Sequence, residues 1–358
     1  MEKTQTNDAR VAGRIDAGLD RLAAEGSSFS LSYLTPAEFA VHQARCHGTL
    51  LGAIAFGAQA PQEMPAACPY AWVDMPVFDN ATLFEVWTSD RPVVRENSAG
   101  VAAARNADTL FGCVRLKLDC KLEAASYLAY SQIFDYIDRC GYPHLLRAWN
   151  YIPRINALDD GVERYVSFNV GRHDAFAAKG RIIGTDTPAA SALGSRGDYL
   201  IVYFLAAKQA GHLVENPRQT SAFNYPVQYG PRSPTFARAM LVQSGGEHQL
   251  LVSGTSSIVG HATLHAGDAA AQTRETVANV RAVIANARLA GANSSSRTPR
   301  FMLKAYVRHP GDLAAIRDCL TADFGATGTI FYLQADICRA DLLMEVEGVC
   351  LNESAQSA

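Results

Sequence analysis

The chain has 358 residues, a formal net charge of −3 and 48% hydrophobic residues, the balance of a globular protein with a large core. A charge this close to zero excludes a global positive field for nucleic acid or an anionic membrane, so the positive partners of any anionic ligand must be local. No apolar run approaches the roughly 18 residues of a membrane span, and residues 1–12 lack the apolar core of a secretory signal. We therefore expect a cytoplasmic protein that binds neither nucleic acid nor membrane.

The sequence contains none of the common cofactor or metal motifs. Its eight cysteines are scattered without a Cys-x-x-Cys pair or a zinc-like Cys/His cluster, which favours free thiols in a reducing compartment. His261 and His265 are four residues apart, but no helix or acidic third ligand accompanies them. No P-loop, dinucleotide-binding glycine motif or serine-hydrolase elbow is present. We expect neither a metal nor a cofactor.

The first hundred residues show packed elements but no recognisable chemistry, and the first clear unit follows them. Residues 110–118 (LFGCVRLKL) predict a strand, and residues 123–140 predict a helix with a regular apolar face. Gly141 is placed to end that helix in the left-handed conformation. Residues 145–152 and 199–206 (YLIVYFLA) predict two further strands.

Between the two units, residues 211–238 are rich in Pro, Tyr, Asn and Arg. Four prolines in this stretch exclude a regular helix, and its aromatic residues argue against disorder. A long irregular segment inside a compact protein is usually functional, although a wrapped inter-domain linker is the alternative.

The second unit repeats the order of the first. Its predicted elements are a strand at 249–258, a helix at 270–289, a strand at 301–308, a short helix opening at Asp312, and strands at 328–334 and 342–349. The sequence thus predicts an α/β (α+β) protein with two tandem domains, each a mixed sheet with helices packed on one face. We divide it into an N-terminal domain (1–210), an inter-domain segment (211–238) and a C-terminal domain (239–358).

Several arginines lie among apolar, proline or glycine residues, where a guanidinium needs an acidic partner because it cannot lose its charge. Those singled out are Arg154 (NYIPRIN), Arg172 (FNVGR), Arg232 and Arg238 (GPRSPTFAR), Arg308, and Arg339 (DICRADLL). Internal salt bridges are the alternative for each of them. Since few acids lie beside them in the sequence, we expect at least two to hold an anionic ligand, most naturally a small dicarboxylate.

Glu345 and Glu347 flank Val346 in the apolar strand LLMEVEGV. Alternate residues of a strand point the same way, so both carboxylates share one face, which must meet solvent, another subunit or a polar cavity. Two close like charges raise the pKa of at least one, and this would suit proton transfer near neutral pH. A solvent-facing edge of the sheet is the alternative.

Six motifs in order resemble the chorismatase family: NYIPRIN (150–156), RYVSFNVGR (164–172), GPRSPTFARA (230–239), SGTSSIVGHAT (253–263), QTRETVANV (272–280) and QADICRADLLMEVEG (334–348). The family's C-terminal part is similar to the trimeric RidA/YjgF fold, and the resemblance implies two RidA/YjgF-like domains here. It also implies catalysis on chorismate without metal or organic cofactor. Benzoate-forming members have Glu and Cys at the positions of Glu345 and Cys338, whereas a position that is Gly or Ala in the better known branches is Ser256 here.

The resemblance implies a reaction and a set of site residues. Pyruvate would leave after protonation of the enolpyruvyl methylene, and attack of the C4 hydroxyl on C3 would give an arene oxide that opens to 3-hydroxybenzoate, alone or with 4-hydroxybenzoate. Glu345 is the candidate for the proton transfers, and Cys338 is the second catalytic candidate. The expected substrate contacts are Arg154, Tyr165, Arg172, Tyr225, Arg232, Arg238 and Ser256.

Three alternatives remain open: a chorismate hydrolase that forms a dihydroxycyclohexadiene carboxylate, a RidA-like imine deaminase that uses Arg339, and a non-catalytic module that binds aromatic acids. We expect a monomer, because two fused units and the N-terminal region could mimic a trimer within one chain, and a true trimer is the alternative.

Overall fold

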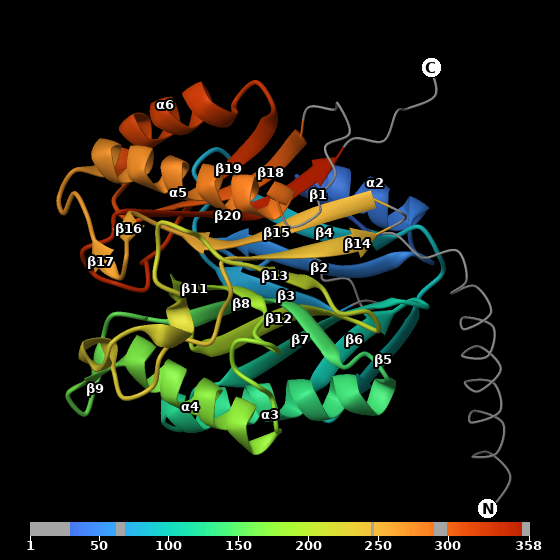
Figure 1. Ribbon diagram of the computed structural model, residues 1–358. Helices are drawn as coiled ribbons and strands as arrows, with labels where there is room; N and C mark the ends of the chain where they lie inside the picture. Colours follow the sequence, from blue (N-terminus) through green and yellow to red (C-terminus); the bar gives the residue numbers. More distant parts are fainter. Residues whose placement is uncertain (1–28, 62–68, 245–246, 290–298, 353–358) are drawn as a thin grey trace, which may run out of the picture.

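The computed structural model describes residues 29–61, 69–244, 247–289 and 299–352. In this part of the chain the backbone forms three main β-sheets, which follow one another along the sequence (Figure 1). Two short ribbons accompany them: β9 (Leu158–Asp159) with β10 (Val162–Glu163), and β16 (Ile258–Val259) with β17 (Ala262–Thr263). None of the described helices has the length and apolar character that crossing a bilayer would require.

The N-terminal sheet has the strand order β1-β4-β2-β3 and carries one helix. Its elements are β1 (Phe29–Leu34), α2 (Pro36–Arg45), β2 (Leu50–Gly57), β3 (Tyr70–Asp74) and β4 (Thr82–Ser89). A capping box starts α2, because the Thr35 side chain accepts from the amide of Glu38 and the Glu38 carboxylate accepts from the amide of Thr35 at 2.8 Å. Every residue of β2 is buried, as expected for a central strand.

The middle sheet has six strands in the order β11-β8-β12-β7-β6-β5. Its elements are β5 (Val94–Ser98), β6 (Val101–Arg105), β7 (Thr109–Lys117), α3 (Leu122–Cys140), β8 (His144–Pro153), α4 (Arg164–Ala178), β11 (Ala189–Ser195) and β12 (Tyr199–Ala207). Gly141 ends α3 with φ of 76°, the left-handed conformation that the sequence predicted.

The C-terminal sheet has six strands in the order β13-β14-β15-β20-β18-β19. Its elements are β13 (His212–Val214), β14 (Ala239–Ser244), β15 (Glu247–Thr255), α5 (Ala269–Leu289), β18 (Pro299–Val307), η4 (Pro310–Asp312), α6 (Leu313–Phe324), β19 (Gly328–Gln334) and β20 (Met344–Asn352). Between β13 and β14 the chain is irregular apart from two 3₁₀ turns, η2 (Ala222–Asn224) and η3 (Val227–Tyr229). The irregular course expected for this segment is thus confirmed.

All three sheets share one connectivity. In each, an early strand leads through a helix to a central strand, a later strand pairs parallel to that central strand, and a closing strand pairs antiparallel on its other side. The parallel pairs are β2–β3, β8–β11 and β18–β19, and the closing strands are β4, β12 and β20. One chain therefore contains three copies of the same pairing pattern.

The inner faces of the three sheets meet in one central core. This core contains Phe56 and Trp87 from the N-terminal sheet, Trp149 and Tyr203 from the middle sheet, and Tyr306 from the C-terminal sheet. Separate apolar clusters attach the helices to the outer faces, so that α3 and α4 lie on one side of the molecule and α5 and α6 on the opposite side (Figure 1).

The prediction of a mixed α/β protein with helices on one face of each sheet is confirmed for the middle and C-terminal sheets. The structure adds the N-terminal sheet and helix α4, which the sequence pattern did not predict. The domain boundaries at 210 and 238 stay predictions, and β13 within the intervening segment pairs with the C-terminal sheet.

Candidate active site

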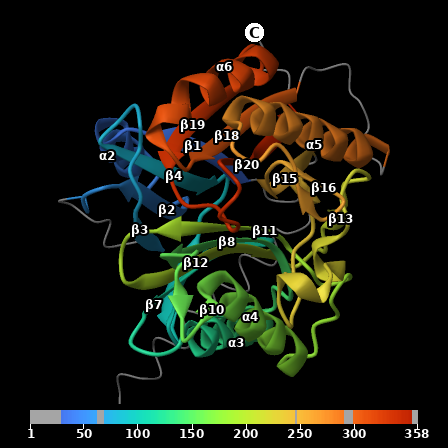
Figure 2. The same ribbon diagram turned by 90° about the vertical axis from the view of Figure 1, so that its left-hand side faces the viewer.

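A cavity of about 560 Å³ opens where the edge of the middle sheet meets the C-terminal sheet. Residues of β11, of α4 and of the ends of β15 and β20 line it, together with residues of the irregular segment before β14. Figure 2 shows where these elements lie in the fold. The volume falls within the range of about 300–1,000 Å³ that is typical of small-molecule sites.

Edge strand β11 assembles this cavity. Ala189 at its start forms a parallel bridge with Ala237, and Leu193 forms an antiparallel bridge with Ile337. Ala237 and Ile337 directly precede Arg238 and Cys338 in the chain. By pairing with both segments, β11 brings an arginine and a cysteine that are 100 residues apart to the same hollow.

Glu345 of β20 reaches into the cavity and is only 4% exposed. Burial, followed by the neighbouring carboxylate of Glu347, raises the pKa of Glu345 to about 8. Ser256 Oγ donates to Glu345 Oε2 at 3.3 Å. Residue 254 must be small, since a Cβ on Gly254 would overlap Glu345 Oε1. At neutral pH this carboxyl group holds its proton and can serve as a general acid, so the raised pKa expected for this pair is confirmed.

Two buried arginines line the cavity, and some of their N–H groups donate no hydrogen bond to the described residues. The guanidinium of Arg172, from α4, lies 4.8 Å from the ring centroid of Tyr130, and its Nε and Nη2 have no hydrogen-bond partner within the described ranges. Arg238 donates from Nη2 to Thr220 O and to Tyr225 Oη, each at 2.8 Å, while its Nε likewise has no partner there. Such donors call for an acceptor, and a carboxylate is the natural one.

Cys338 and Tyr165 add two neutral groups to the wall. Burial, with a smaller contribution from Glu345, raises the pKa of the Cys338 thiol to about 12. Burial also raises the pKa of Tyr165, and the nearby Cys338 adds to this effect. Both groups therefore stay protonated at neutral pH and can act as hydrogen-bond donors, not as nucleophilic anions.

The irregular segment and the loop before β20 meet at the opening. The Arg339 guanidinium lies 4.0 Å from the ring centroid of Tyr229 and 5.3 Å from that of Tyr225. Arg339 Nη1 also donates to His261 O at 2.8 Å, and Tyr229 Oη donates to the same oxygen at 2.8 Å. This stack holds the irregular segment against the C-terminal sheet.

The structure brings most of the predicted site residues to one place. Seven of them line the cavity: Tyr165, Arg172, Tyr225, Arg238, Ser256, Cys338 and Glu345. They come from both the middle and the C-terminal sheets and from the segment between them. Their roles toward a substrate stay predictions.

Arg154 and Arg232 are not among the residues that line the cavity, and their role as substrate contacts stays a prediction. Arg154 sits in a turn after β8 with φ of 51°, which leaves it exposed. Arg232 is half-exposed and pairs with Asp174 of α4 at 3.2 Å, an internal salt bridge. Arg308, another of the singled-out arginines, pairs with Asp336 at 2.6 Å.

Sequence reasoning missed Tyr229 and Ser191, both of which line the cavity. The spacing of Tyr225 and Tyr229 in a proline-rich segment was an available signal for the first. Ser191 had no signal, because it lies in the small-residue strand AASALGS. Its importance comes from contacts with residues far away in the chain.

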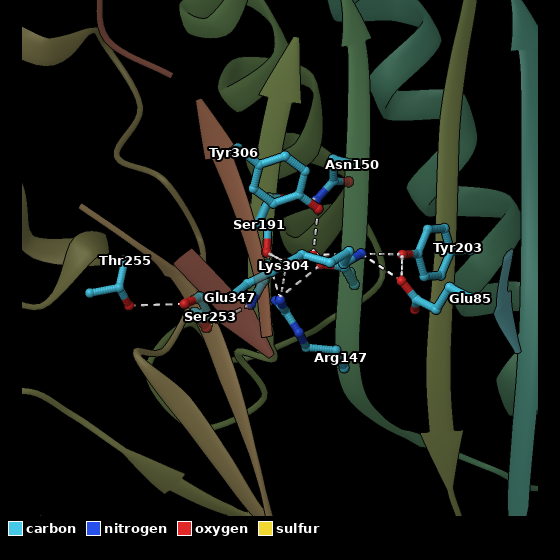
Figure 3. A network of polar contacts seen from close by, with 12 residues as sticks. Glu85, Arg147, Asn150, Ser191, Tyr203, Ser253, Thr255, Lys304, Tyr306 and Glu347 are labelled. Carbon is cyan, nitrogen blue, oxygen red and sulfur yellow. Dashed lines mark hydrogen bonds and ion pairs between the residues drawn. The ribbon is translucent and has the colours of Figure 1, made fainter. Parts of the chain in front are cut away.

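Glu347 enters a second buried cluster, which we call the central network (Figure 3). Lys304 Nζ lies 2.6 Å from Glu85 Oε2 and 2.7 Å from Glu347 Oε1. Arg147 Nη2 contacts Glu347 Oε2 at 2.5 Å. Further donors are Tyr306 and Ser191 to Glu347, and Tyr203 to Glu85. Two anions and two cations, drawn from all three sheets, therefore balance one another.

Ionisation within the central network follows from these contacts. Burial alone would raise the pKa of Glu347, but Lys304 and Arg147 outweigh it and hold the pKa below its ordinary value. Burial would lower the pKa of Lys304, but Glu347 and Glu85 outweigh it and raise the pKa well above the usual range. Glu347 is thus ionised while Glu345, two residues earlier, is protonated.

Comparison with known proteins gives consistent results. Residues 85–206 match the family described as "Chorismatase FkbO/Hyg5-like, N-terminal". A chorismatase of Streptomyces rapamycinicus is 37% identical over 79% of this chain and 86% of its own length. A 3-hydroxybenzoate synthase of Streptomyces hygroscopicus is 37% identical over 75% of this chain and 81% of its own length. A chorismatase crystal structure superimposes with a TM-score of 0.83 at 33% identity and covers 90% of this chain and 98% of its own. The chain therefore belongs to the chorismatase family.

Proposed function

We propose that the protein converts chorismate to 3-hydroxybenzoate and pyruvate in the cavity around Glu345. The observation that carries this proposal is the pairing of a buried, protonated carboxyl group with buried arginines whose donors are unused. Chorismate carries one carboxylate on the ring and one on the enolpyruvyl side chain. Arg172 and Arg238 supply a cation for each, and a cavity of about 560 Å³ accommodates a molecule of this size.

The reaction begins with proton donation from Glu345 to the methylene carbon of the enolpyruvyl group. The resulting carboxylate of Glu345 then accepts the proton of the C4 hydroxyl as the C4 oxygen attacks C3. The C3–O bond breaks, and its electron pair leaves with pyruvate. The ring product is an arene oxide, which isomerises to 3-hydroxybenzoate with loss of the ring proton at C3 and regain of one proton at oxygen. No water, oxidant or reductant is consumed.

Neutral donors on the wall support this route over hydrolysis. Cys338 and Tyr165 stay protonated, so neither activates a water molecule as a base. Glu345 is also in its acid form, so it cannot act as a base until it has donated its proton. Ser256, which donates to Glu345, is the residue expected to influence the share of 4-hydroxybenzoate.

The test is product analysis of purified protein with chorismate in ¹⁸O-labelled water, followed by HPLC with mass spectrometry. We expect 3-hydroxybenzoate and pyruvate in equal amounts, with no ¹⁸O in the aromatic product. A dihydroxycyclohexadiene carboxylate, with or without ¹⁸O, would instead identify a hydrolase. The absence of pyruvate would overturn the proposal.

We also propose that the chain works as a cytoplasmic monomer. The three sheets of like connectivity already surround one core, which supports a complete assembly within one chain. Light scattering should give the mass of a single chain, 38.5 kDa. A threefold larger mass would contradict this.

A further inference from the structure

The central network lies outside the cavity, yet it is joined to the cavity wall by two residues. Glu347 follows Glu345 by two positions on β20 and points to the same side of the sheet. Ser191 lines the cavity, accepts from Arg147 Nη2 at 2.5 Å and donates to the Glu347 carboxylate. A Cβ placed on Gly254 would touch both Glu345 and, at 3.3 Å, Ser191 Cβ. Ser191 thus belongs to the cavity wall and contacts the network directly.

We propose that the central network keeps the proton on Glu345 through the negative charge of Glu347. Lys304 and Arg147 hold Glu347 in its ionised form. Glu85 of the N-terminal sheet contributes indirectly, because it pairs with Lys304. These are positioning residues, since none of Glu347, Lys304 and Glu85 lines the cavity. The inference rests on the proposed function, because it assigns a role to a network beside the proton donor.

The network is arranged to keep its own charges fixed. All four charged members are buried, with Glu85, Arg147, Lys304 and Glu347 each at most 1% exposed. Glu347 has two cations and two hydroxyl donors, so the network favours its carboxylate form strongly. A fixed negative charge beside a second buried carboxyl group disfavours ionisation of that second group. Of the two carboxyl groups, Glu345 is therefore the one that holds a proton.

Other groups also face Glu345, and they differ in how they affect its pKa. Ser256 donates to it from the end of β15, and the charges of Arg147 on β8 and Arg238 before β14 favour its ionised form. Cys338 and Tyr165 face it as neutral groups. Among these, only Glu347 opposes ionisation by charge, so Glu347 is the residue whose removal should have the largest effect.

The sign of each substitution follows. Glu347→Gln removes the adjacent negative charge, so the pKa of Glu345 falls. Glu85→Gln leaves Lys304 shared with Glu347 alone, so more positive potential remains near Glu345 and its pKa falls by a smaller amount. Adding Lys304→Met to Glu85→Gln restores the charge balance, so the pKa returns toward the wild-type value. A purely structural role predicts instead that the second substitution only adds to the damage.

The experiment is an infrared titration of the carboxylic-acid carbonyl band of Glu345, identified as the band that Glu345→Gln removes. This readout needs no substrate, so it can fail independently of the proposed function. The matched control is Glu96→Gln, which removes a carboxylate from β5, outside both the cavity and the network. A parallel series measures the high-pH limb of pyruvate release from chorismate, which requires the acid form of Glu345 and should be lost as the pH rises through its pKa.

We expect a midpoint at about 8 in the wild type and in Glu96→Gln. It should fall by about one unit or more in Glu347→Gln, by less in Glu85→Gln, and recover in Glu85→Gln/Lys304→Met. If Glu347→Gln does not fold, Glu85→Gln and its double variant decide the matter. Unchanged midpoints in folded network variants, or an equal fall in Glu96→Gln, would overturn the inference.

Discussion

The protein buries two clusters of opposite charges side by side, and they differ in whether the charges are matched. In the central network, two carboxylates and two cations contact one another directly, and none of their buried polar atoms is without a partner in the described chain. In the cavity, Arg172 and Arg238 retain donors without acceptors there, and Glu345, which lines the same cavity, is protonated. The first cluster is complete within the protein, whereas the second is completed by a ligand.

This difference separates stability from function. A buried ion network that satisfies itself contributes to holding the three sheets together, and removing one member leaves a charge without its partner. Burying cations without acceptors lowers the stability of the fold, and the other interactions of the protein must offset this cost. The cations gain acceptors only when an anion binds. Substitutions in the two clusters should therefore change different measurements.

The largest effect is expected from Glu345→Gln. This change keeps the size of the side chain but removes the proton donor, so kcat for pyruvate release should fall by about 10²- to 10⁴-fold. The free energy of unfolding should stay the same or rise, because the buried carboxyl group is already neutral at pH 7. A coupled pyruvate assay and urea denaturation measure the two quantities. A variant with wild-type kcat would remove Glu345 from the mechanism.

Lys304→Met should act in the opposite way. It leaves Glu85 and Glu347 without a shared cation in a site that is about 1% exposed, so the free energy of unfolding should fall by about 3–5 kcal/mol. Lys179→Met is the control, because Lys179 pairs with the exposed Asp135 and such surface pairs contribute about 0–1 kcal/mol. Equal losses in urea denaturation of the two variants would contradict the distinction between the clusters.

Arg172→Gln tests whether the unused donors of the cavity bind the substrate. Loss of a charged hydrogen bond to a carboxylate costs about 1.5–3 kcal/mol, so KM for chorismate should rise by at least about tenfold. The unfolding free energy should not fall by a comparable amount, since no described partner of its Nε and Nη2 is lost. Arg232→Gln, outside the cavity, is the matched control for KM. Identical KM values in the two variants would exclude Arg172 as a substrate contact.

The smallest effect is expected from Arg154→Gly. Arg154 lies outside the cavity, so KM should change by no more than about twofold, as for other surface substitutions. Its φ of 51° suits glycine, so the unfolding free energy should be equal or higher. A large rise in KM would instead show that Arg154 contacts the substrate.

The sequence was sufficient for those parts of the site that depend on local pattern. Glu345 and Glu347 were placed on one face because a strand alternates, and the proline-rich segment was predicted to be irregular because prolines break helices. Arg154 and Arg232 lie outside the cavity lining for different physical reasons. Arg154 has a left-handed backbone conformation and its side chain is exposed. Arg232 pairs with Asp174, which lies 58 positions away in the sequence.

The N-terminal sheet was not predicted, because its buried strand LLGAIAFG shows neither strand alternation nor helical spacing. A signal for the central network was nevertheless present. Glu85 and Lys304 are single charges within the apolar strands TLFEVWTS and PRFMLKAYV, and a lone buried charge requires a partner. What the sequence could not provide is that the two charges meet, since that depends on how the three sheets assemble.

The most direct test is a calorimetric titration of chorismate into Glu345→Gln protein, which should bind the substrate without consuming it. We expect one molecule bound per chain, and an affinity at least about tenfold weaker when Arg172→Gln is added. Equal affinity of the single and double variants, or no binding to either, would show that the unused donors of the cavity do not await the carboxylates of the substrate.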